Sequence, residues 1–206
     1  MRLLLTILLI QLSAVSCQLS AQLKYELNCE PYLIQLSYDS LLAQVGIKEA
    51  TGNNDGEVLK YQKIFGLRNQ PYCQMLQYWC YYITTKDVTD IPIPKSAMAI
   101  SSYNYAKKKG VLVPYEPTVH DLLVYQNKNM STGHVERIIK TGGLGWVIVV
   151  AGNTSNGKTG NQREGNGVYK RERNIYHPLS RILLIKGLVG FRPVRNTAEK
   201  QGCNVK

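Results

Sequence analysis

Histidine and acidic residues are scarce in this sequence, which contains three histidines and 14 aspartates and glutamates against 25 lysines and arginines. The scarcity of histidine limits any histidine acting as a base to His120, His134 or His177. The formal net charge of +11 favours anionic partners such as nucleic acid, membrane surfaces or cell-wall polymers. Because the basic residues are spread along the chain without a long block, the charge fits a simply basic protein equally well.

Long apolar segments are also lacking. The apolar run at residues 3–10 is well short of the ~20 residues that span a bilayer, and no later segment is long enough either. The chain has no internal repeat and no linker between domains. Its 206 residues, of which 44% are apolar and 19% charged, predict one folded domain with short extensions rather than a disordered chain.

The N-terminus has the three regions of a secretory signal in their usual order. Arg2 precedes the apolar run, and the small residues Ser13, Ala14 and Ser16 follow it. We therefore expect the protein to be exported to the periplasm, the cell envelope or the medium. Cys17 ends this segment in a sequence similar to a bacterial lipobox, which would make it a lipid anchor; ordinary cleavage after Ser16, Cys17 or Ala21 is the alternative.

The other four cysteines are Cys29, Cys73, Cys80 and Cys203. An exported protein can pair its cysteines as disulfides. Cys73 and Cys80 cannot pair within a straight helix, because seven residues rise ~10.5 Å and a disulfide needs Cα atoms closer than ~7 Å. Cys29 and Cys203 lie near the two ends of the chain, so their pairing stays open.

Helical patterns fill the first half of the chain and strand patterns fill the second. Apolar residues at helical spacing predict helices at residues 37–45, 55–66 and 71–83, and a fourth helix after Pro94 that ends at Lys109. Short apolar segments between turn residues predict strands at 121–125, 134–140, 146–151, 168–173 and 187–192, with a hairpin turn at Gly142 and Gly143. Helices followed by an antiparallel meander indicate an α+β domain.

Cys73 is the candidate nucleophile. Pro71 is tolerated at a helix start, so Cys73 falls in the first turn of the predicted 71–83 helix. The helix dipole and the unpaired backbone N–H groups of a first turn favour a thiolate. Cys80, two turns later on the same side, fits the commoner role of a small buried hydrophobic residue.

His134 is the candidate base, because it begins a strand pattern that could face the start of that helix. Asn153 ends the next strand, so a hairpin would bring it close to His134. Its amide oxygen could then accept the imidazole N–H and fix the tautomer. Asp121 and Glu136 are the alternatives for this role, although no pattern in the sequence places either beside the imidazole. The order Cys, His, Asn recurs in papain-like cysteine hydrolases.

These segments resemble the CHAP family, which is related to the NlpC-type peptidoglycan hydrolases. Residues 71–80 are similar to the nucleophile helix of the family, Gly133-His134-Val135 to its histidine strand and residues 152–155 to its Glu-Gly-Asn-Thr segment. Residues 121–125, 167–173 and 190–193 resemble further strands, so that the resemblance covers about residues 41–193. The chain departs from the pattern at Ala151, where the family usually has an acidic residue, and at His120, where it has glycine.

The resemblance implies a papain-like fold, with N-terminal helices packed on an antiparallel sheet, and a cysteine hydrolase that cleaves amide bonds in peptidoglycan. Together with the signal-like N-terminus, it divides the chain into a signal segment at 1–17, an N-terminal extension at 18–36, the hydrolase domain at 37–195 and a tail at 196–206. We expect Cys73, His134 and Asn153 to act without a metal or cofactor, on peptidoglycan or its fragments and not on nucleic acid. The alternative is an inactive envelope protein that binds peptidoglycan through its basic surface.

Two other patterns have simpler explanations. Residues 152–159 match the P-loop pattern, but no helical pattern follows and no strand ending in Asp comes later to hold Mg²⁺. Residues 51–56 resemble the start of a calcium loop but lack the closing Glu, which favours a turn with Asp55 as a helix cap.

Overall fold

The computed structural model describes residues 22–156 and 165–194. Three segments lie outside the described residues: the signal-like segment with Cys17, the 196–206 tail with Cys203, and residues 157–159 of the P-loop-like match. Within the described part, no helix has the length and apolar character needed to cross a membrane.

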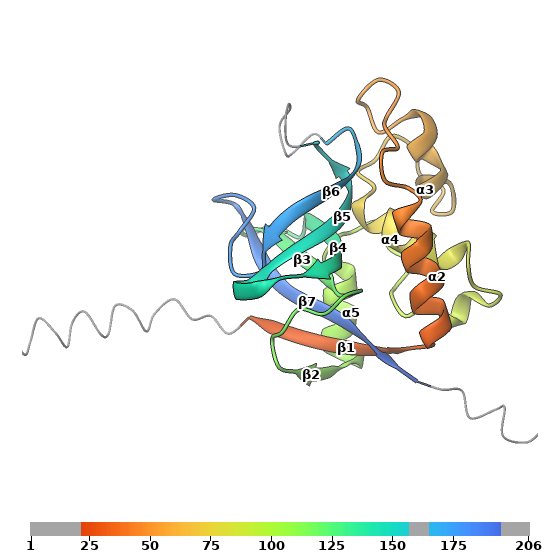
Figure 1. Ribbon diagram of the computed structural model, residues 1–206. Coiled ribbons are helices and arrows are strands. Elements are labelled where there is room, and N and C mark those ends of the chain that lie inside the picture. The colour runs from red at the N-terminus through yellow and green to blue at the C-terminus, as the bar shows by residue number, and fades with distance from the viewer. Residues whose placement is uncertain (1–21, 157–164, 195–206) are drawn as a thin grey trace, which may run out of the picture.

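The chain forms a mixed α/β fold, in which helices pack beside one curved sheet (Figure 1). The helical segments are α2 (Pro31–Leu42), η1 (Gly56–Val58), α3 (Leu59–Lys63), α4 (Cys73–Tyr82), η2 (Val88–Asp90), α5 (Ser101–Lys109) and η3 (Gly143–Gly145). The strands are β1 (Leu23–Cys29), β2 (Val111–Val113), β3 (Leu122–Asn127), β4 (Gly133–Thr141), β5 (Trp146–Thr154), β6 (Gly167–Asn174) and β7 (Leu183–Pro193).

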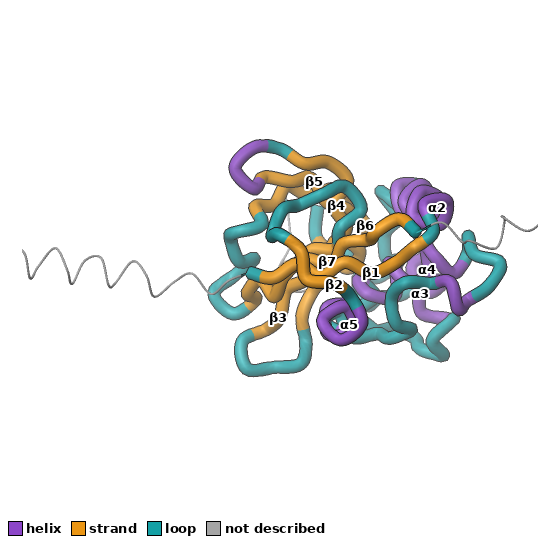
Figure 2. The backbone as a smooth tube through the Cα atoms, turned by 90° about the horizontal axis from the view of Figure 1, so that it is seen from below, coloured by secondary structure: helices purple, strands orange, loops and turns teal. Residues whose placement is uncertain are grey.

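The seven strands lie in the order β2-β1-β7-β3-β4-β5-β6. Strands β3 to β6 form the predicted antiparallel meander, and η3 makes the predicted hairpin connection between β4 and β5. The sheet is nevertheless mixed, because β1 runs parallel to β7. Figure 2 shows α2, α3 and α4 grouped on one side of the sheet, whereas α5 lies apart from them, against β1 and β7.

The predicted helices and strands all occur, with shifted boundaries. The 55–66 segment is a short 3-10 turn followed by α3, and the helix predicted after Pro94 begins only at Ser101. Asp55 stands at the predicted cap position, but its carboxylate accepts hydrogen bonds from the backbone N–H and hydroxyl of Thr51 instead of capping the helix. Residues 51–55 therefore form a hydrogen-bonded turn that precedes η1 and α3.

Strand β1 was not predicted, and it corrects the domain boundary at residue 37. Residues 23–36, assigned to an extension, supply β1 and the first half of α2, and β1 lies inside the sheet between β2 and β7. The signal for this strand was present in the sequence and was overlooked, because residues 23–29 alternate strictly between apolar and polar side chains. The structure departs from the alternation in one respect, since the polar Lys24 is buried.

Lys24 is buried because it is fully paired. Its ammonium group lies 2.8 Å from the Asp121 carboxylate and donates to the Glu116 carbonyl and the Thr118 hydroxyl, at 2.9 and 3.1 Å. Burial raises the pKa of Asp121, an effect that Lys24 and Thr118 only partly offset. This ion pair fastens β1 to the turn before β3.

Arg137 fixes β4 against α2. Its guanidinium is fully buried and donates to the Ser37 hydroxyl at 3.0 Å and to the Ile34 carbonyl at 3.2 Å, with the Tyr81 ring centroid 5.2 Å away. Because side chains alternate along a strand, a side chain of β4 that points to α2 leaves its neighbour Glu136 on the opposite face. The orientation of β4 at the candidate site is thereby set.

We predict that Lys24→Ala destabilises the protein by about 3–5 kcal/mol, because the buried Asp121 carboxylate loses its partner. Urea unfolding measures the loss. The control is Lys60→Ala, which breaks the more exposed Lys60–Glu57 pair and should cost less than about 1 kcal/mol. Equal losses for the two variants would contradict the role given to Lys24.

Candidate active site

Cys73 is the first residue of α4, as the sequence predicted for a helix start. Its side chain is buried, and the backbone N–H groups of Gln74 and Val135 donate to the sulfur. Helix α4 is held in place by Gln74, which exchanges hydrogen bonds of 2.8 and 3.1 Å with the Ser102 hydroxyl of α5. The nucleophile is thus positioned by two helices and the start of β4.

His134, near the start of β4, contacts the Cys73 thiol by a side-chain hydrogen bond, so the structure brings the predicted pair together. Its close approach to β3 depends on Gly133, where a Cβ atom would collide with the Tyr125 carbonyl. The Tyr125 ring lies beside the imidazole, with the two ring centroids 6.5 Å apart. The imidazole side chain is only 12% exposed, so the pair sits just beneath the surface.

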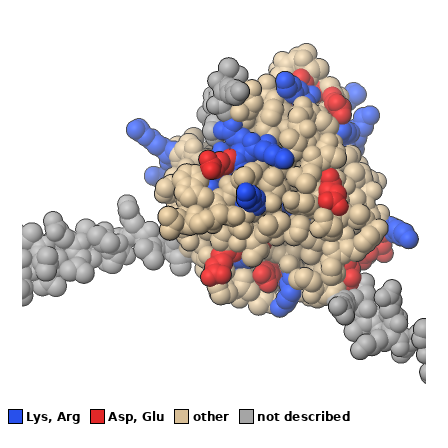
Figure 3. All heavy atoms as spheres, viewed as in Figure 1, with Lys and Arg blue, Asp and Glu red and all other residues tan. Residues whose placement is uncertain are grey.

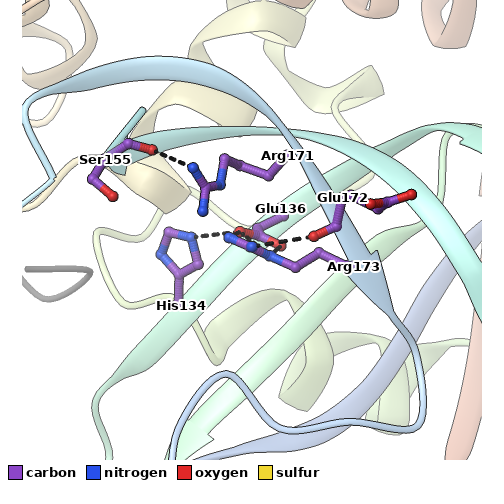
Figure 4. Close-up of polar contacts among 6 residues, drawn as sticks. All are labelled: His134, Glu136, Ser155, Arg171, Glu172 and Arg173. Carbon is purple, nitrogen blue, oxygen red and sulfur yellow. Dashed lines mark hydrogen bonds and ion pairs between the residues drawn. The ribbon is translucent and has the colours of Figure 1, made fainter. Parts of the chain in front are cut away.

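The group that orients His134 is Glu136. The Nε2 atom of His134 lies 3.2 Å from the Glu136 carboxylate (Figure 4). Because Nε2 is engaged in this way, Nδ1 is the nitrogen left for the Cys73 thiol. Cys73, His134 and Glu136 therefore form one continuous chain of hydrogen bonds from α4 to β4.

Arg173 of β6 completes the chain. Its Nε lies 2.9 Å and its Nη2 2.7 Å from the Glu136 carboxylate, which makes the contact bidentate. Glu136 is completely buried and Arg173 nearly so. A buried carboxylate without such a partner would be expected to take up a proton, so Arg173 keeps Glu136 ionised.

Asn153 does not hold the imidazole in the structure, which corrects the predicted third residue. Its Oδ1, the atom that was to accept the imidazole N–H, is buried and has no hydrogen-bond partner within the described residues. The backbone of Asn153 turns into the left-handed region, with φ 55°, and its N–H contacts the Tyr72 hydroxyl. The carboxylate that the chain lacks at Ala151 comes instead from Glu136, on the neighbouring strand.

The pKa values of the three groups shift together. Burial opposes a thiolate at Cys73, but the hydrogen bond and charge of His134 outweigh it and lower the pKa of the thiol. Burial likewise opposes the imidazolium, yet contacts with Cys73 and Glu136 raise the pKa of His134 to about 10. Burial also disfavours the Glu136 carboxylate, but His134 and Arg173 lower its pKa to about 2. These contacts therefore favour the thiolate of Cys73 and the imidazolium of His134.

The other cysteines and histidines lie in different surroundings. Burial raises the pKa of both Cys29 and Cys80 to about 12, and within the described residues both are free thiols. His120 has its ring 4.8 Å from that of Tyr38 on α2, and burial, together with the Arg137 charge, lowers its pKa to about 4. His177 is exposed in the turn after β6.

The remaining motif-like segments take no part in this site. The described start of the P-loop-like match, Gly152 to Thr154, continues strand β5, where a P-loop would leave the strand. Within the described part of the chain, no cluster of three or more His, Cys, Asp or Glu side chains is arranged to hold a metal ion. Comparison with known proteins gives no further lead: no family model, curated protein sequence or solved structure matches this chain.

Sequence reasoning named Glu136 only as an alternative to Asn153. It missed Arg173 and also Arg171, whose guanidinium lies near the site in Figure 4. A signal for Glu136 was present, because residues two apart on a strand point to the same face and Glu136 follows His134 at that spacing. The two arginines are at the same spacing on β6, but the sequence alone does not say which strand faces them.

We predict that iodoacetamide alkylates Cys73 at least ~10-fold faster than Cys80 at pH 7, because only Cys73 is a stabilised thiolate. Mass spectrometry of the two peptides over time measures both rates in one sample. Cys73→Ser shows whether Cys80 labelling is independent. Equal rates in the folded protein would contradict the assignment of the nucleophile.

We predict that Glu136→Gln moves the alkylation profile of Cys73 to higher pH, because loss of the carboxylate weakens the imidazolium that stabilises the thiolate. Asn153→Ala should leave the profile unchanged. The measurement is the iodoacetamide rate from pH 4 to 10, with circular dichroism to confirm that both variants fold; Glu136→Asp, which keeps the charge, should lie between wild type and Glu136→Gln. A shift of the profile with Asn153→Ala and none with Glu136→Gln would show that Asn153, and not Glu136, orients His134.

Proposed function

We propose that the protein is a papain-like cysteine hydrolase that cleaves amide bonds in peptidoglycan outside the cell that makes it. The observation that carries the proposal is the buried chain Cys73–His134–Glu136, in which the thiol pKa is lowered and the imidazole pKa is raised. A structural cysteine has no need of a thiolate, whereas a nucleophile requires one. The resemblance of residues 71–80 and 133–135 to the CHAP family supplies the substrate class.

In the first half of the proposed reaction, the Cys73 thiolate attacks the carbonyl carbon of the amide. The backbone N–H of Cys73, the first residue of α4, has no acceptor within the helix and would stabilise the resulting oxyanion. The imidazolium of His134 gives its proton to the nitrogen of the leaving amine, the C–N bond breaks, and a thioester remains on Cys73.

In the second half, neutral His134 takes a proton from water, and the hydroxide attacks the thioester carbon. The C–S bond breaks, the carboxylic acid product leaves, and the thiolate–imidazolium pair is restored. Glu136 stabilises the imidazolium and holds the ring throughout, while Arg173 keeps Glu136 ionised. All of the groups that this scheme requires are side chains or backbone atoms of the chain itself.

An inactive peptidoglycan-binding protein is the alternative that the sequence left open, and it was based on the missing acid at Ala151. Glu136 supplies a carboxylate to His134, which favours the enzyme. The basic side chains do not form a single large patch on the face shown in Figure 3, where acidic side chains lie among them. The signal-like N-terminus supports an exported protein, with Cys17 as a possible lipid anchor.

We predict that the protein lacking residues 1–17 releases soluble fragments from purified peptidoglycan. Mass spectrometry of the fragments distinguishes cleavage between sugar and peptide from cleavage within the peptide. Cys73→Ala should abolish release, whereas Cys80→Ala, a buried cysteine outside the chain of hydrogen bonds, should retain it if it folds. Release by Cys73→Ala at the wild-type rate, or none by wild type, would refute the proposal.

We predict a bell-shaped dependence of kcat/KM on pH. Activity rises as Cys73 ionises, at a pH below the ordinary 9.0 of a thiol, and it falls as His134 loses its proton near pH 10, because the leaving amine then receives none. Initial rates on soluble muropeptides give the profile. An acidic limb at or above pH 9 would contradict the stabilised thiolate.

A further inference from the structure

Arg171 places a second guanidinium at the site, two residues before Arg173 on β6. Its Nη1 donates to the Ser155 carbonyl at 3.1 Å, and in Figure 4 the rest of the guanidinium lies over the His134–Glu136 pair. Side chains two apart on a strand share a face, so Arg171 and Arg173 point the same way. Lys170 and Glu172, which alternate with them along β6, are exposed.

Arg171 lacks an anionic partner in the described part of the chain. Glu136 is the nearby carboxylate, but it already receives the Nε and Nη2 atoms of Arg173 and the His134 ring. Nε of Arg171 is buried and unpaired, and its only hydrogen bond to a described residue is the one to the neutral Ser155 carbonyl. The Nε–Nη2 edge, which Arg173 uses to bind Glu136, is therefore unused in Arg171.

The site consequently carries an excess of positive charge. Among the residues that the structure describes, the imidazolium of His134 and the two guanidinium groups face two anions, the Cys73 thiolate and the Glu136 carboxylate. Burial and the Arg173 charge lower the pKa of Arg171, whereas Glu136 raises it, so on balance the surroundings disfavour the charged guanidinium. Because a guanidinium remains charged in proteins, an anion supplied from outside would stabilise it.

We propose that Arg171 binds a carboxylate of the substrate beside Cys73, so that the enzyme selects amide bonds with a free carboxyl group next to the cleaved bond. A guanidinium edge matches a carboxylate in shape and binds it by two parallel hydrogen bonds. The identity of the substrate rests on the proposed function, but the anion site itself does not.

The anion site is tested by alkylation, without any hydrolysis. Iodoacetate and iodoacetamide place a carboxylate or a neutral amide at the same distance from the reacting carbon. The ratio of their rates at Cys73 should fall on the order of 10-fold in Arg171→Gln, because a nearby positive charge is lost. The control Lys170→Gln removes one charge from an exposed position on the same strand and should leave the ratio unchanged. Arg171→Lys, which keeps the charge, should lower the ratio less than Arg171→Gln does. An unchanged ratio in folded Arg171→Gln would overturn the anion site.

Substrate selection is tested with muropeptides that differ only in whether the carboxyl group beside the cleaved bond is free or amidated. Wild type should prefer the free acid in kcat/KM, and Arg171→Gln should lose that preference. Cleavage of both peptides alike by wild type would refute the selectivity and leave the hydrolase intact. A wild type that cleaves neither, yet shows the alkylation effect, would refute the hydrolase and leave the anion site intact.

Discussion

The site depends on the pairing of the buried Glu136 carboxylate with Arg173 and His134. Arg173 holds the carboxylate ionised from one side, with a pKa of about 2, and His134 contacts it from the other. Without these partners, a carboxyl group buried to this extent would be expected to stay neutral, and a neutral acid would not favour the imidazolium. The thiolate at Cys73 in turn depends on that imidazolium. Opposite charges therefore alternate from β6 through β4 to the start of α4, and each is stable only because its neighbours are present.

The geometry of this chain follows from alternation along two strands. On β4, His134 and Glu136 share one face, and the intervening and following residues, Val135 and Arg137, belong to the other. Arg137 is tied to α2, so β4 cannot slip by one residue without exchanging the two faces. Fixing a helix to the back of a strand thus sets the position of the catalytic groups on its front.

The sequence was sufficient to select Cys73 and His134 as the candidate nucleophile and base, because each lies in a local pattern: Cys73 at a helix start and His134 at a strand start. It was insufficient for the group that orients His134, since hairpin pairing alone favoured Asn153, whose side-chain oxygen has no partner among the described residues. Glu136 required knowledge of the partner that keeps a buried acid charged. β1 is a different case, because its alternating sequence is a local strand pattern that was overlooked; only the burial of Lys24 depends on a distant residue, Asp121. Local patterns are visible in a sequence, whereas compensation of buried charge is a property of the folded molecule.

The parallel pairing of β1 with β7 also determines the order in which this molecule can be assembled. The first described strand and the last lie side by side, with Leu23 opposite Gly187 and Cys29 opposite Pro193. β7 also fills the place between β1 and β3, so this edge of β3 has no partner until the chain has been synthesised as far as β7. Contacts between such distant segments slow folding, and an open strand edge invites pairing with another chain. During synthesis the central β3–β7 seam is thus the part of the sheet that stays open longest after β3 has formed.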